Sequence, residues 1–447
     1  MIPLVNADIA RVAGTDHHRA AAAREKVTEL GRLRILFLCH RFPYPPNSGA
    51  SVRAFHIIRH LSASGHEVTV ASLARSSREA EEGRGIAHFC NRYEMVRVHD
   101  PVQVARMVLR LPTTTPSTMG FFHSPELAQR VRELLEREHF ELIFVYCSSM
   151  AQYVAGVRGI PKILDFVDMD SQKWLDYARF KSFPLAAGYW LEGKKLERAE
   201  KRLARTFDLC TAVTRAEWET LEGYRSAVAT DWFPNGVDSG YFAPTDEPYD
   251  ADTICFVGRM DYYPNQECMI EFCANVLPLV RTRRPETMLL IIGADPSRAV
   301  RRLGDLPGVM VTGSVPDVRP YLRRSALMVA PLNIARGTQN KILEGMAAGI
   351  PVVASRVAAG GVDAVANDHF LVASTPEEYV NAVLRILEDP AFRQQLSAAG
   401  RQRVLSHHAW DGSMQRLDGI INRCLRAQRD SRGDVAGNEE RAALVPK

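Results

Sequence analysis

The sequence predicts an α/β protein built from two Rossmann-like, doubly wound parallel-sheet domains. Two series of short apolar strands alternate with helical stretches, one on each side of a turn-rich segment at Asp231–Pro244. Strands that are separated by helix-length crossovers pair in parallel, so each series predicts one sheet with helices on both faces. With 447 residues, the chain is long enough for two or three domains.

The first series begins with an apolar run of strand length at Arg34–Cys39. A helix is expected over Val52–Ser64, because its apolar residues recur at helical spacing and Gly65 follows it. A strand at Glu67–Leu73 completes a βαβ unit. The series continues with strands at Tyr93–Val98, Leu142–Tyr146, Lys162–Val167 and Leu209–Val213, a helix that starts at Ser124-Pro125, and a basic helix over residues 189–206.

The second series also alternates strands and helices. Strands are expected at Ile254–Val257, Met288–Ile292, Val309–Thr312, Leu327–Ala330, Val352–Ala354 and Phe370–Val372. Three helix starts are expected where a capping side chain precedes a first-turn proline, at Asp295-Pro296, Thr375-Pro376 and Asp389-Pro390.

These elements predict six parts in the chain. They are a flexible N-terminal extension (1–32), an N-terminal Rossmann-like acceptor domain (33–232), a linker (233–252), a C-terminal Rossmann-like donor domain (253–409), a helix that can cross back to the first domain (410–428) and a flexible tail (429–447). In doubly wound sheets, ligands bind at the carboxyl ends of the strands, so the candidate site residues are sought there.

Composition and charge exclude several classes of function. A net charge of +4 is small for this length and argues against a nucleic-acid binder with a broad basic face. Eight scattered cysteines without a CxxC pair favour reduced thiols and a cytoplasmic protein. No apolar run reaches the roughly 18–20 residues that span a bilayer. The basic helix over 189–206 predicts either a solvated face or peripheral contact with an anionic membrane.

The stretch Gly337–Ser355, with the sequence GTQNKILEGMAAGIPVVAS, carries the strongest indication of a binding site. A glycine loop at Gly337-Thr338 enters a short helix, whose free N–H groups and dipole favour an anion. Lys341 adds a positive charge one turn before Glu344, whose carboxylate can accept hydrogen bonds from sugar hydroxyls. The pattern predicts a sugar-nucleotide site.

Other candidates lie near predicted strand ends. Gly258 and Arg259 follow the strand Ile254–Val257, where a phosphate clamp belongs; the alternative for Arg259 is a surface residue of a loop. Gly49, in the first loop, would let the backbone approach a ligand or would simply form a turn. This loop is not GxGxxG, which disfavours a nicotinamide dehydrogenase.

Two aspartates, Asp165 and Asp168, end the strand that begins at Lys162. Adjacent carboxylates can raise a pKa and supply acid–base catalysis, or they can be structural caps. The pairs His17-His18 and His407-His408 lack the partners of a zinc site, so no metal is expected.

These motifs resemble a known family. The stretch 337–355 resembles the donor-binding signature of retaining GT-B glycosyltransferases of family four. PNGVDSGYFAP resembles the interdomain signature of that family, FVGRM its glycine–arginine strand end, and GSVPDVRPYL its nucleobase-side loop, which adds Val315 to the donor site. MDYYPNQECMIEF and LDFVDMDSQKW resemble sugar transferases associated with bacterial exopolysaccharide and PEP-CTERM/exosortase loci.

Three positions depart from the family pattern. Of its paired glutamates, Glu344 matches the ribose-binding one, and Arg336 stands in place of the other, as a third cation or the mark of a changed donor. The lysine that follows the glycine–arginine pair falls near Asn265, so Lys341 is expected to supply that charge from the other loop. The frequent histidine of the first domain is absent, and Asp165 and Asp168 stand nearby.

The resemblance implies an enzyme that transfers a sugar from a nucleotide diphosphate sugar to a glycan or lipid-linked acceptor with retention, without a metal or other cofactor. Arg259, Lys341 and Asp168 are the expected catalytic residues. Two other functions remain open: a GT-B sugar-nucleotide epimerase, and a degenerate, non-catalytic subunit of a polysaccharide assembly complex, which Arg336 favours.

Overall fold

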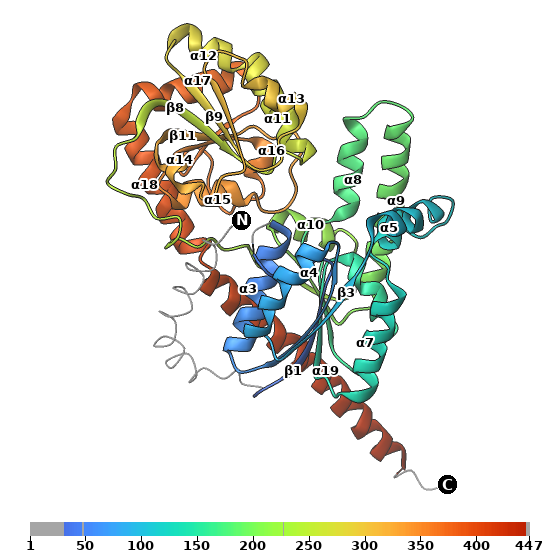
Figure 1. Cartoon of the computed structure of the whole chain (residues 1–447). Helices are drawn as coiled ribbons and strands as arrows, with labels where there is room; N and C mark the ends of the chain where they lie inside the picture. The colour runs from blue at the N-terminus through green and yellow to red at the C-terminus, as the bar shows by residue number, and fades with distance from the viewer. Residues whose placement is uncertain (1–30, 47–48, 227, 444–447) are drawn as a thin grey trace. The chain divides into compact units, whose positions relative to one another are not determined.

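The computed structural model describes residues 31–46, 49–226 and 228–443, which form two compact units (Figure 1). The N-terminal unit runs up to Phe233 and also includes the C-terminal segment from Met414, and the C-terminal unit is Pro234–Ser413. Both are α/β units around a parallel sheet.

The N-terminal unit has a seven-stranded sheet in the order β3-β2-β1-β4-β5-β6-β7. Its strands are β1 (Arg34–Cys39), β2 (Glu67–Ala74), β3 (Arg92–Arg97), β4 (Leu142–Tyr146), β5 (Lys162–Asp165), β6 (Leu209–Ala212) and β7 (Ala229–Trp232). The apolar runs of β1 and β4 pair in the middle of the sheet, with Phe37 opposite Phe144. Both strands are buried on both faces, as continuous apolar runs in parallel sheets usually are.

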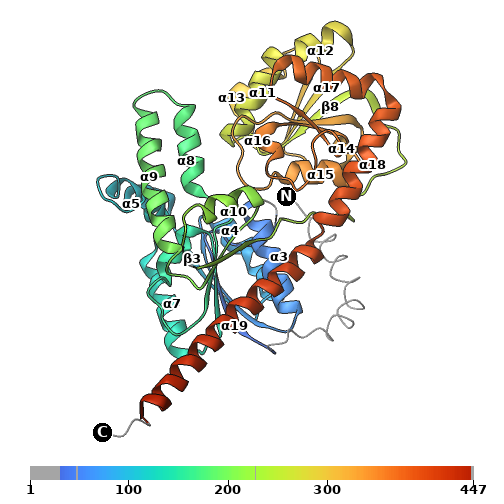
Figure 2. The same cartoon turned by 180° about the vertical axis from the view of Figure 1, so that it is seen from behind.

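Helices pack around this sheet and extend beyond it (Figures 1 and 2). They are α3 (Gly49–Ala63), α4 (Ser77–Gly83), α5 (Asp100–Leu109), α6 (Ser117–Phe121), α7 (Pro125–Arg137), α8 (Asp170–Arg179), α9 (Leu185–Leu203) and α10 (Arg215–Glu222), with 3-10 turns η1 (Arg84–His88) and η2 (Ser148–Tyr153). Helices α8 and α9 form a hairpin that projects from the unit beside α5.

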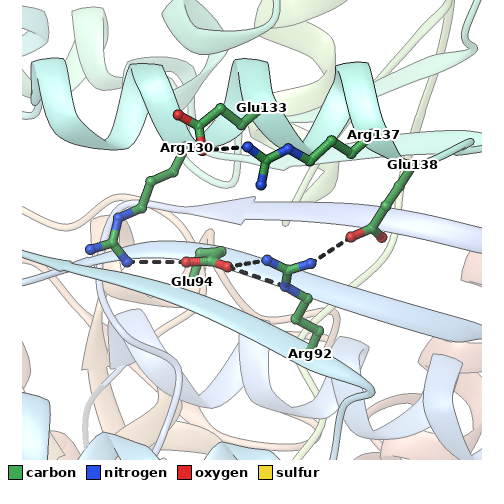
Figure 3. A network of polar contacts seen from close by, with 6 residues as sticks. All are labelled: Arg92, Glu94, Arg130, Glu133, Arg137 and Glu138. Atoms are coloured by element: carbon green, nitrogen blue, oxygen red, sulfur yellow. Dashed lines mark hydrogen bonds and ion pairs between the residues drawn. The ribbon is translucent and has the colours of Figure 1, made fainter.

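Charged side chains join α7 to the edge strand β3 (Figure 3). Glu94 of β3 pairs with Arg92 of the same strand and with Arg130 of α7, at 2.7 and 3.0 Å. Arg92 also pairs with Glu138, just beyond α7, at 2.6 Å. Charges along an edge strand discourage pairing with another chain.

The C-terminal unit has a six-stranded sheet in the order β10-β9-β8-β11-β12-β13. Its strands are β8 (Asp250–Val257), β9 (Met288–Ile292), β10 (Val309–Gly313), β11 (Ser325–Ala330), β12 (Val352–Ser355) and β13 (Leu371–Ala373). Its helices are α11 (Tyr263–Asn275), α12 (Leu277–Arg283), α13 (Arg298–Leu303), α14 (Arg319–Arg323), α15 (Asn340–Ala347), α16 (Arg356–Ala359), α17 (Pro376–Glu388) and α18 (Pro390–His407).

Both sheets therefore follow the Rossmann strand order, and the predicted fold class is confirmed. The order reverses between β1 and β4 in the first sheet, and between β8 and β11 in the second. A ligand of such a sheet binds at this switch point, beyond the carboxyl ends of the two strands.

The last helix, α19 (Trp410–Ala443), packs against the N-terminal unit (Figure 2). Its residues Leu417, Ile420 and Ile421 are buried. Asp231, in β7, accepts hydrogen bonds from Arg416 and Arg423. The helix continues through the stretch 429–443, where we expected a flexible tail; this stretch contains alanine, glutamate and arginine and no proline.

Most predicted elements are present, with boundaries moved by a few residues. The helix start at Asp295-Pro296 was wrong. Ser297 caps α13 instead, because Asp295 has a φ of +55°, which does not fit the extended backbone of a capping residue. Gly49 was expected in a loop, but it is the first residue of α3. The basic helix spans Leu185–Leu203 rather than 189–206, and β7, α4, α5, α6 and α8 were not predicted.

Candidate functional site

Glycines allow a close approach of backbone segments at the switch point of the C-terminal sheet. Gly258 follows β8, and Gly293 follows the neighbouring strand β9 with a φ of +156°. A Cβ atom at Gly293 would collide with the carbonyl oxygen of Gly258. A Cβ atom at Gly258 would lie 2.7 Å from the Asn265 amide nitrogen and 3.2 Å from Lys341 Nζ. Because neither glycine has a side chain, the side chains of Lys341 and Asn265 can reach the backbone at the end of β8.

Lys341 is held by hydrogen bonding and by burial. Its Nζ donates to Asn265 Oδ1 at 2.7 Å and lies 4.4 Å from the centre of the Phe256 ring. Burial lowers the pKa of Lys341 to about 8, although Cys268 and Glu344 act in the opposite direction. The lysine therefore titrates close to neutral pH, where an incoming anion can readily favour its charged form.

Glu344 lies one turn after Lys341 on α15. Burial raises the pKa of its carboxyl group to about 7, and the nearby Lys341 opposes the shift. Opposite charges one turn apart on a helix stabilise each other. The pair offers a cation and a hydrogen-bond acceptor side by side, as the binding of a phosphate and adjacent hydroxyls requires.

Arg259 extends outward from the same strand end. Its guanidinium pairs with Asp261 at 2.7 Å and with Asp295 at 3.1 Å, and its side chain is 57% exposed. The Arg259 carbonyl accepts a hydrogen bond from Asn265 Nδ2 at 2.8 Å. Asn265 thus connects the loop that carries Arg259 to the helix that carries Lys341.

The glycine loop before α15 is tightly packed. Gly337 has a φ of +61°, and a Cβ atom at Gly361 would collide with the Gly337 carbonyl oxygen. The Thr338 hydroxyl is buried without a hydrogen-bond partner among the described residues. Arg336 is half-buried, and its carbonyl accepts a hydrogen bond from Gln339 at 3.1 Å. A buried hydroxyl without a partner is costly unless a ligand or water completes it.

Val315 lies farther along the sheet. It follows the edge strand β10, which is two positions from β8, and it is half-buried against the core of the C-terminal unit. Gly258, Arg259, Lys341 and Glu344 are therefore grouped, with Arg336, Gly337 and Thr338 on the adjoining loop, whereas Val315 follows a strand two positions away at the same edge of the sheet.

In the N-terminal unit, the two candidate aspartates have different environments. Asp165 is fully buried and pairs with the equally buried Arg53 at 2.8 Å. Arg53 also donates to the Phe233 carbonyl at 3.0 Å and covers the Phe233 ring at 3.6 Å. Asp165 is thus engaged in holding the unit together.

Asp168, three residues later, is partly exposed. Burial raises the pKa of its carboxyl group to about 6, with Asp170 and Asp165 adding to the shift and Lys173 opposing it. A carboxyl group that titrates near neutral pH can exchange a proton under ordinary conditions. Of the two aspartates, Asp168 has the environment expected of a reactive group.

His40 and Cys147 follow the switch-point strands β1 and β4 of the N-terminal sheet. The His40 Nδ1 and Cys147 Sγ atoms are 3.1 Å apart. Burial lowers the pKa of His40 to about 3 and raises the pKa of Cys147 to about 12, so a neutral thiol faces a neutral imidazole. Cys147 has a φ of +74°, an uncommon conformation that clusters at functional sites.

Two remaining predictions concern Gly49 and metals. Gly49 is exposed at the start of α3, and the two residues before it lie outside the described part. Within the described residues, no group of three histidines, cysteines or acidic residues is placed to hold a metal ion. His408 hydrogen-bonds to the Asn235 carbonyl and the Asp363 N–H, whereas His17 and His18 lie outside the described residues.

Two family matches account for most of the chain. Residues 47–241 match Glycosyltransferase Family 4, and residues 251–389 match Glycosyl transferases group 1. The chain carries both of these glycosyltransferase domains. The second match contains the whole cluster around Lys341, and the first contains Asp168.

Curated relatives are more distant and are matched over part of their length. A D-inositol 3-phosphate glycosyltransferase of Thermobifida fusca is 26% identical over 276 residues, which are 55% of this chain and 61% of the relative. A GDP-mannose-dependent monoacylated alpha-(1-6)-phosphatidylinositol monomannoside mannosyltransferase of Corynebacterium glutamicum is 24% identical over 49% of this chain and 64% of the relative. The chain thus spans less than two thirds of these relatives.

Solved structures share the two-domain GT-B fold. Sucrose-phosphate synthase from Thermosynechococcus elongatus has a TM-score of 0.65 at 18% identity, over 89% of this chain and all of that one. Anabaena HepE in complex with UDP-glucose has a TM-score of 0.64 at 14% identity, over 88% of this chain and all of that one.

Sequence reasoning assigned no role to three residues at strand ends or beside Lys341: Asn265, His40 and Cys147. The strand-end rule could have indicated His40 and Cys147, because each directly follows a predicted strand. Asn265 had no such signal, since its role comes from Lys341, which is 76 positions away.

Proposed function

We propose that the protein is a glycosyltransferase that moves a sugar from a nucleotide diphosphate sugar to a glycan or lipid-linked acceptor, with retention of configuration. The observation that supports this best is Lys341 Nζ, held 2.7 Å from Asn265 Oδ1 at the glycine-lined end of β8. A lysine with a lowered pKa at this strand end suits a diphosphate, which binds at the switch point of such sheets.

Each residue of the donor site has a role in this proposal. Glu344 accepts hydrogen bonds from the ribose hydroxyls. Lys341 and Arg259 neutralise the diphosphate as it leaves, which stabilises charge where it develops. The N–H groups of Gly337 and Thr338, at the entry to α15, add further donors.

Arg336 adds charge to this site. It directly precedes Gly337, at the position where the family resemblance implies a glutamate. We place it at the diphosphate as a third cation, and Val315 on the nucleobase side. Substituting Arg336 with glutamate should then weaken diphosphate binding and change the donor that is preferred.

The chemistry of retention constrains the acceptor side. Departure and attack on the same face of the sugar require no protein nucleophile, so a pair of carboxylates for double displacement is not needed. Asp168 is the group we assign to the acceptor hydroxyl, because its raised pKa suits proton exchange. Gly49, at the start of α3, has no side chain and would let the protein backbone approach the ligand closely.

The comparisons agree with this class of substrate. HepE structures are described with UDP and with UDP-glucose, and one relative is named as GDP-mannose-dependent. The acceptor and a role in bacterial exopolysaccharide synthesis are proposed from the sequence resemblance. A cytoplasmic location is proposed because all eight cysteines are free thiols. No described helix combines the length and apolar character that crossing a bilayer demands.

The test is a panel of UDP-, GDP-, ADP- and TDP-sugars in thermal shift, since a ligand of the folded state raises its melting temperature. Products formed from the stabilising donor are then analysed with and without acceptor glycans. Transfer with retained anomeric configuration is expected. A changed sugar nucleotide formed from donor alone would instead identify an epimerase.

A second candidate function is a non-catalytic subunit of a polysaccharide assembly complex. It is favoured by Arg336 and by the two carboxylates that engage Arg259. Binding of a nucleotide sugar without any turnover, across a broad panel of acceptors, would support this candidate and contradict transfer.

A further inference from the structure

Helix α5 presents its apolar side to solvent. Its exposed apolar residues are Pro101, Val102, Val104, Ala105, Val108 and Leu109, most of which recur at helical spacing. Leu109 is 73% exposed, and Leu111, just beyond the helix, is 50% exposed. An ordinary surface helix turns such a stripe toward the core.

The polar side of α5 faces inward. Gln103 is buried and donates to the carbonyl oxygens of Phe121 and His123. Arg106 donates to Gln103 Oε1 at 2.7 Å and to the His123 carbonyl at 2.8 Å. These bonds fix the rotation of the helix, so the exposed apolar side is a built feature of the fold.

The turn between α8 and α9 and the first turns of α9 expose a second set of apolar side chains: Phe180, Phe183, Leu185, Trp190 and Leu191. Phe183 is 85% exposed. The hairpin beneath them is well packed, because the Tyr189 ring contacts the rings of Trp174 and Tyr177 at 5.2 and 5.9 Å. The packed hairpin therefore holds the exposed residues in place.

Hydrogen bonds join the two sets. Lys195 of α9 donates to the carbonyl oxygens of Arg110 and Leu111, at 3.2 and 2.7 Å. Glu192 accepts from the Ser117 and Thr118 N–H groups at 2.9 and 2.8 Å. Figures 1 and 2 both show α5 beside α9. The turn between α8 and α9 lies at the outer end of the hairpin, and α5 lies nearer to its base. We call the two sets together the apolar end; they comprise Val102, Val104, Val108, Leu109, Leu111, Phe180, Phe183, Leu185, Trp190 and Leu191.

The segments that carry the apolar residues contain basic but no acidic side chains. No acidic residue occurs in the sequence from Pro101 to Pro125 or from Tyr177 to Leu191. Arg106, Arg110, Arg179 and Lys181 lie within these segments. Arg106 faces inward, and Arg179 pairs at 3.2 Å with Asp176, just before the second segment. Exposed apolar and aromatic residues with a basic border are typical of surfaces that enter the interface of an anionic bilayer.

We propose that the apolar end docks the protein on an anionic phospholipid bilayer, with Trp190, Phe183 and the stripe of α5 in the interfacial layer. This differs from contact through the basic side of α9. There, Lys194 and Lys201 pair with Glu197, and Lys195 bonds to backbone oxygens. Docking goes beyond the proposed function and requires neither a donor nor a turnover.

The test is co-sedimentation of the full chain with vesicles of phosphatidylglycerol and phosphatidylcholine in equal parts, and with vesicles of phosphatidylcholine alone. The protein should pellet with the anionic vesicles. The double variant Leu109→Ser, Phe183→Ser should partition at least about tenfold less, because two large side chains no longer leave water. The matched control is Leu279→Ser, Val365→Ser, which alters two exposed apolar residues of the C-terminal unit and should pellet normally.

Two further measurements locate the contact. Brominated lipids should quench a part of the tryptophan fluorescence that is lost in Trp190→Phe. The double variant Arg179→Gln, Lys181→Gln should weaken binding to anionic vesicles only. Equal pelleting of the Leu109→Ser, Phe183→Ser variant and the unaltered protein would overturn the proposal. The proposal would also be overturned if the unaltered protein pelleted with neither kind of vesicle and formed dimers that the variant does not form. The surface would then bind a second copy of the chain.

Discussion

Asn265 joins two parts of the proposed donor site through a single amide group. Its Oδ1 accepts from Lys341 Nζ at 2.7 Å, and its Nδ2 donates to the Arg259 carbonyl at 2.8 Å. The cation of α15 and the loop after β8 are thereby fixed to each other. The position of Lys341 is set before a substrate arrives, as electrostatic stabilisation of a leaving group requires.

Removing either cation should impair transfer without unfolding the protein. We expect Arg259→Ala and Lys341→Ala each to lower kcat by about 10²–10³-fold, because a donor to the developing charge is lost. Initial rates with the donor found in the panel provide the measurement. Arg302→Ala, at an exposed arginine of α13, is the matched control and should retain normal rates. Near-normal transfer by both cluster variants would contradict the assignment of the diphosphate.

Exchanging Lys341 and Asn265 with each other should keep a positive charge at the end of β8. Lys341→Asn alone should lose donor affinity, and addition of Asn265→Lys should restore at least about tenfold of it, since each decade corresponds to about 1.4 kcal/mol of binding free energy. Titration calorimetry with the donor is the readout. A double variant that binds no better than Lys341→Asn would show that Asn265 does not share the position of the lysine.

Donor binding should have an optimum near pH 7–8. The pKa of Lys341 is lowered by burial to about 8, so its charge is lost as the pH rises through that value, and affinity for the diphosphate falls. The pKa of Glu344 is raised by burial to about 7, so its carboxylate forms only as the pH rises through that value. Binding titrations across the pH range should show affinity falling on the acidic side, through Glu344, and on the alkaline side, through Lys341. We call these the acidic and alkaline limbs.

Lys341→Arg should move the alkaline limb, because arginine stays charged. Glu344→Gln should remove the acidic limb. If the alkaline limb is unchanged in Lys341→Arg, the titrating group is a different one.

The buried pair of the N-terminal unit should contribute to stability. Asp165→Ala leaves Arg53 buried without its carboxylate, and loss of one partner of a buried pair costs about 3–5 kcal/mol of unfolding free energy. Urea denaturation measures this. Arg215→Ala breaks the exposed pair with Glu219 and should cost less than about 1 kcal/mol. Equal effects of the two variants would contradict a structural role for Asp165.

Asp168 should show the opposite behaviour. Asp168→Asn keeps the shape of the side chain and removes a carboxyl group whose burial disfavours its charge. We expect a urea midpoint that is unchanged or higher, and a transfer rate lowered by about 10²-fold or more, as for loss of an acid–base group. A variant with normal transfer would exclude Asp168 from the chemistry.

The sequence predicted the buried strands well because their apolar runs depend on burial alone. Arg34–Cys39 and Leu142–Tyr146 are examples, and both have the predicted bounds. It missed β7, whose four residues, ATDW, carry no such run. The strand-end rule indicated Gly258, Arg259 and the loop before Lys341, and these residues are grouped in the structure.

Other features depend on contacts that no local pattern encodes. Asn265 is distant from Lys341 in the sequence, and only the pairing of β8 with β11 brings their helices together. The apolar stripe of α5 is periodic, but periodicity does not state which side faces the core. The bonds of Gln103 and Arg106 decide that.

The most direct test of the donor assignment is titration calorimetry of the full chain with UDP and GDP and their hexose conjugates, at pH 7.5, beside Lys341→Ala. We predict that at least one nucleotide diphosphate binds with micromolar affinity, and that Lys341→Ala weakens its binding by at least about tenfold. Failure of every nucleotide to bind, or equal binding by Lys341→Ala, would contradict the proposed donor site.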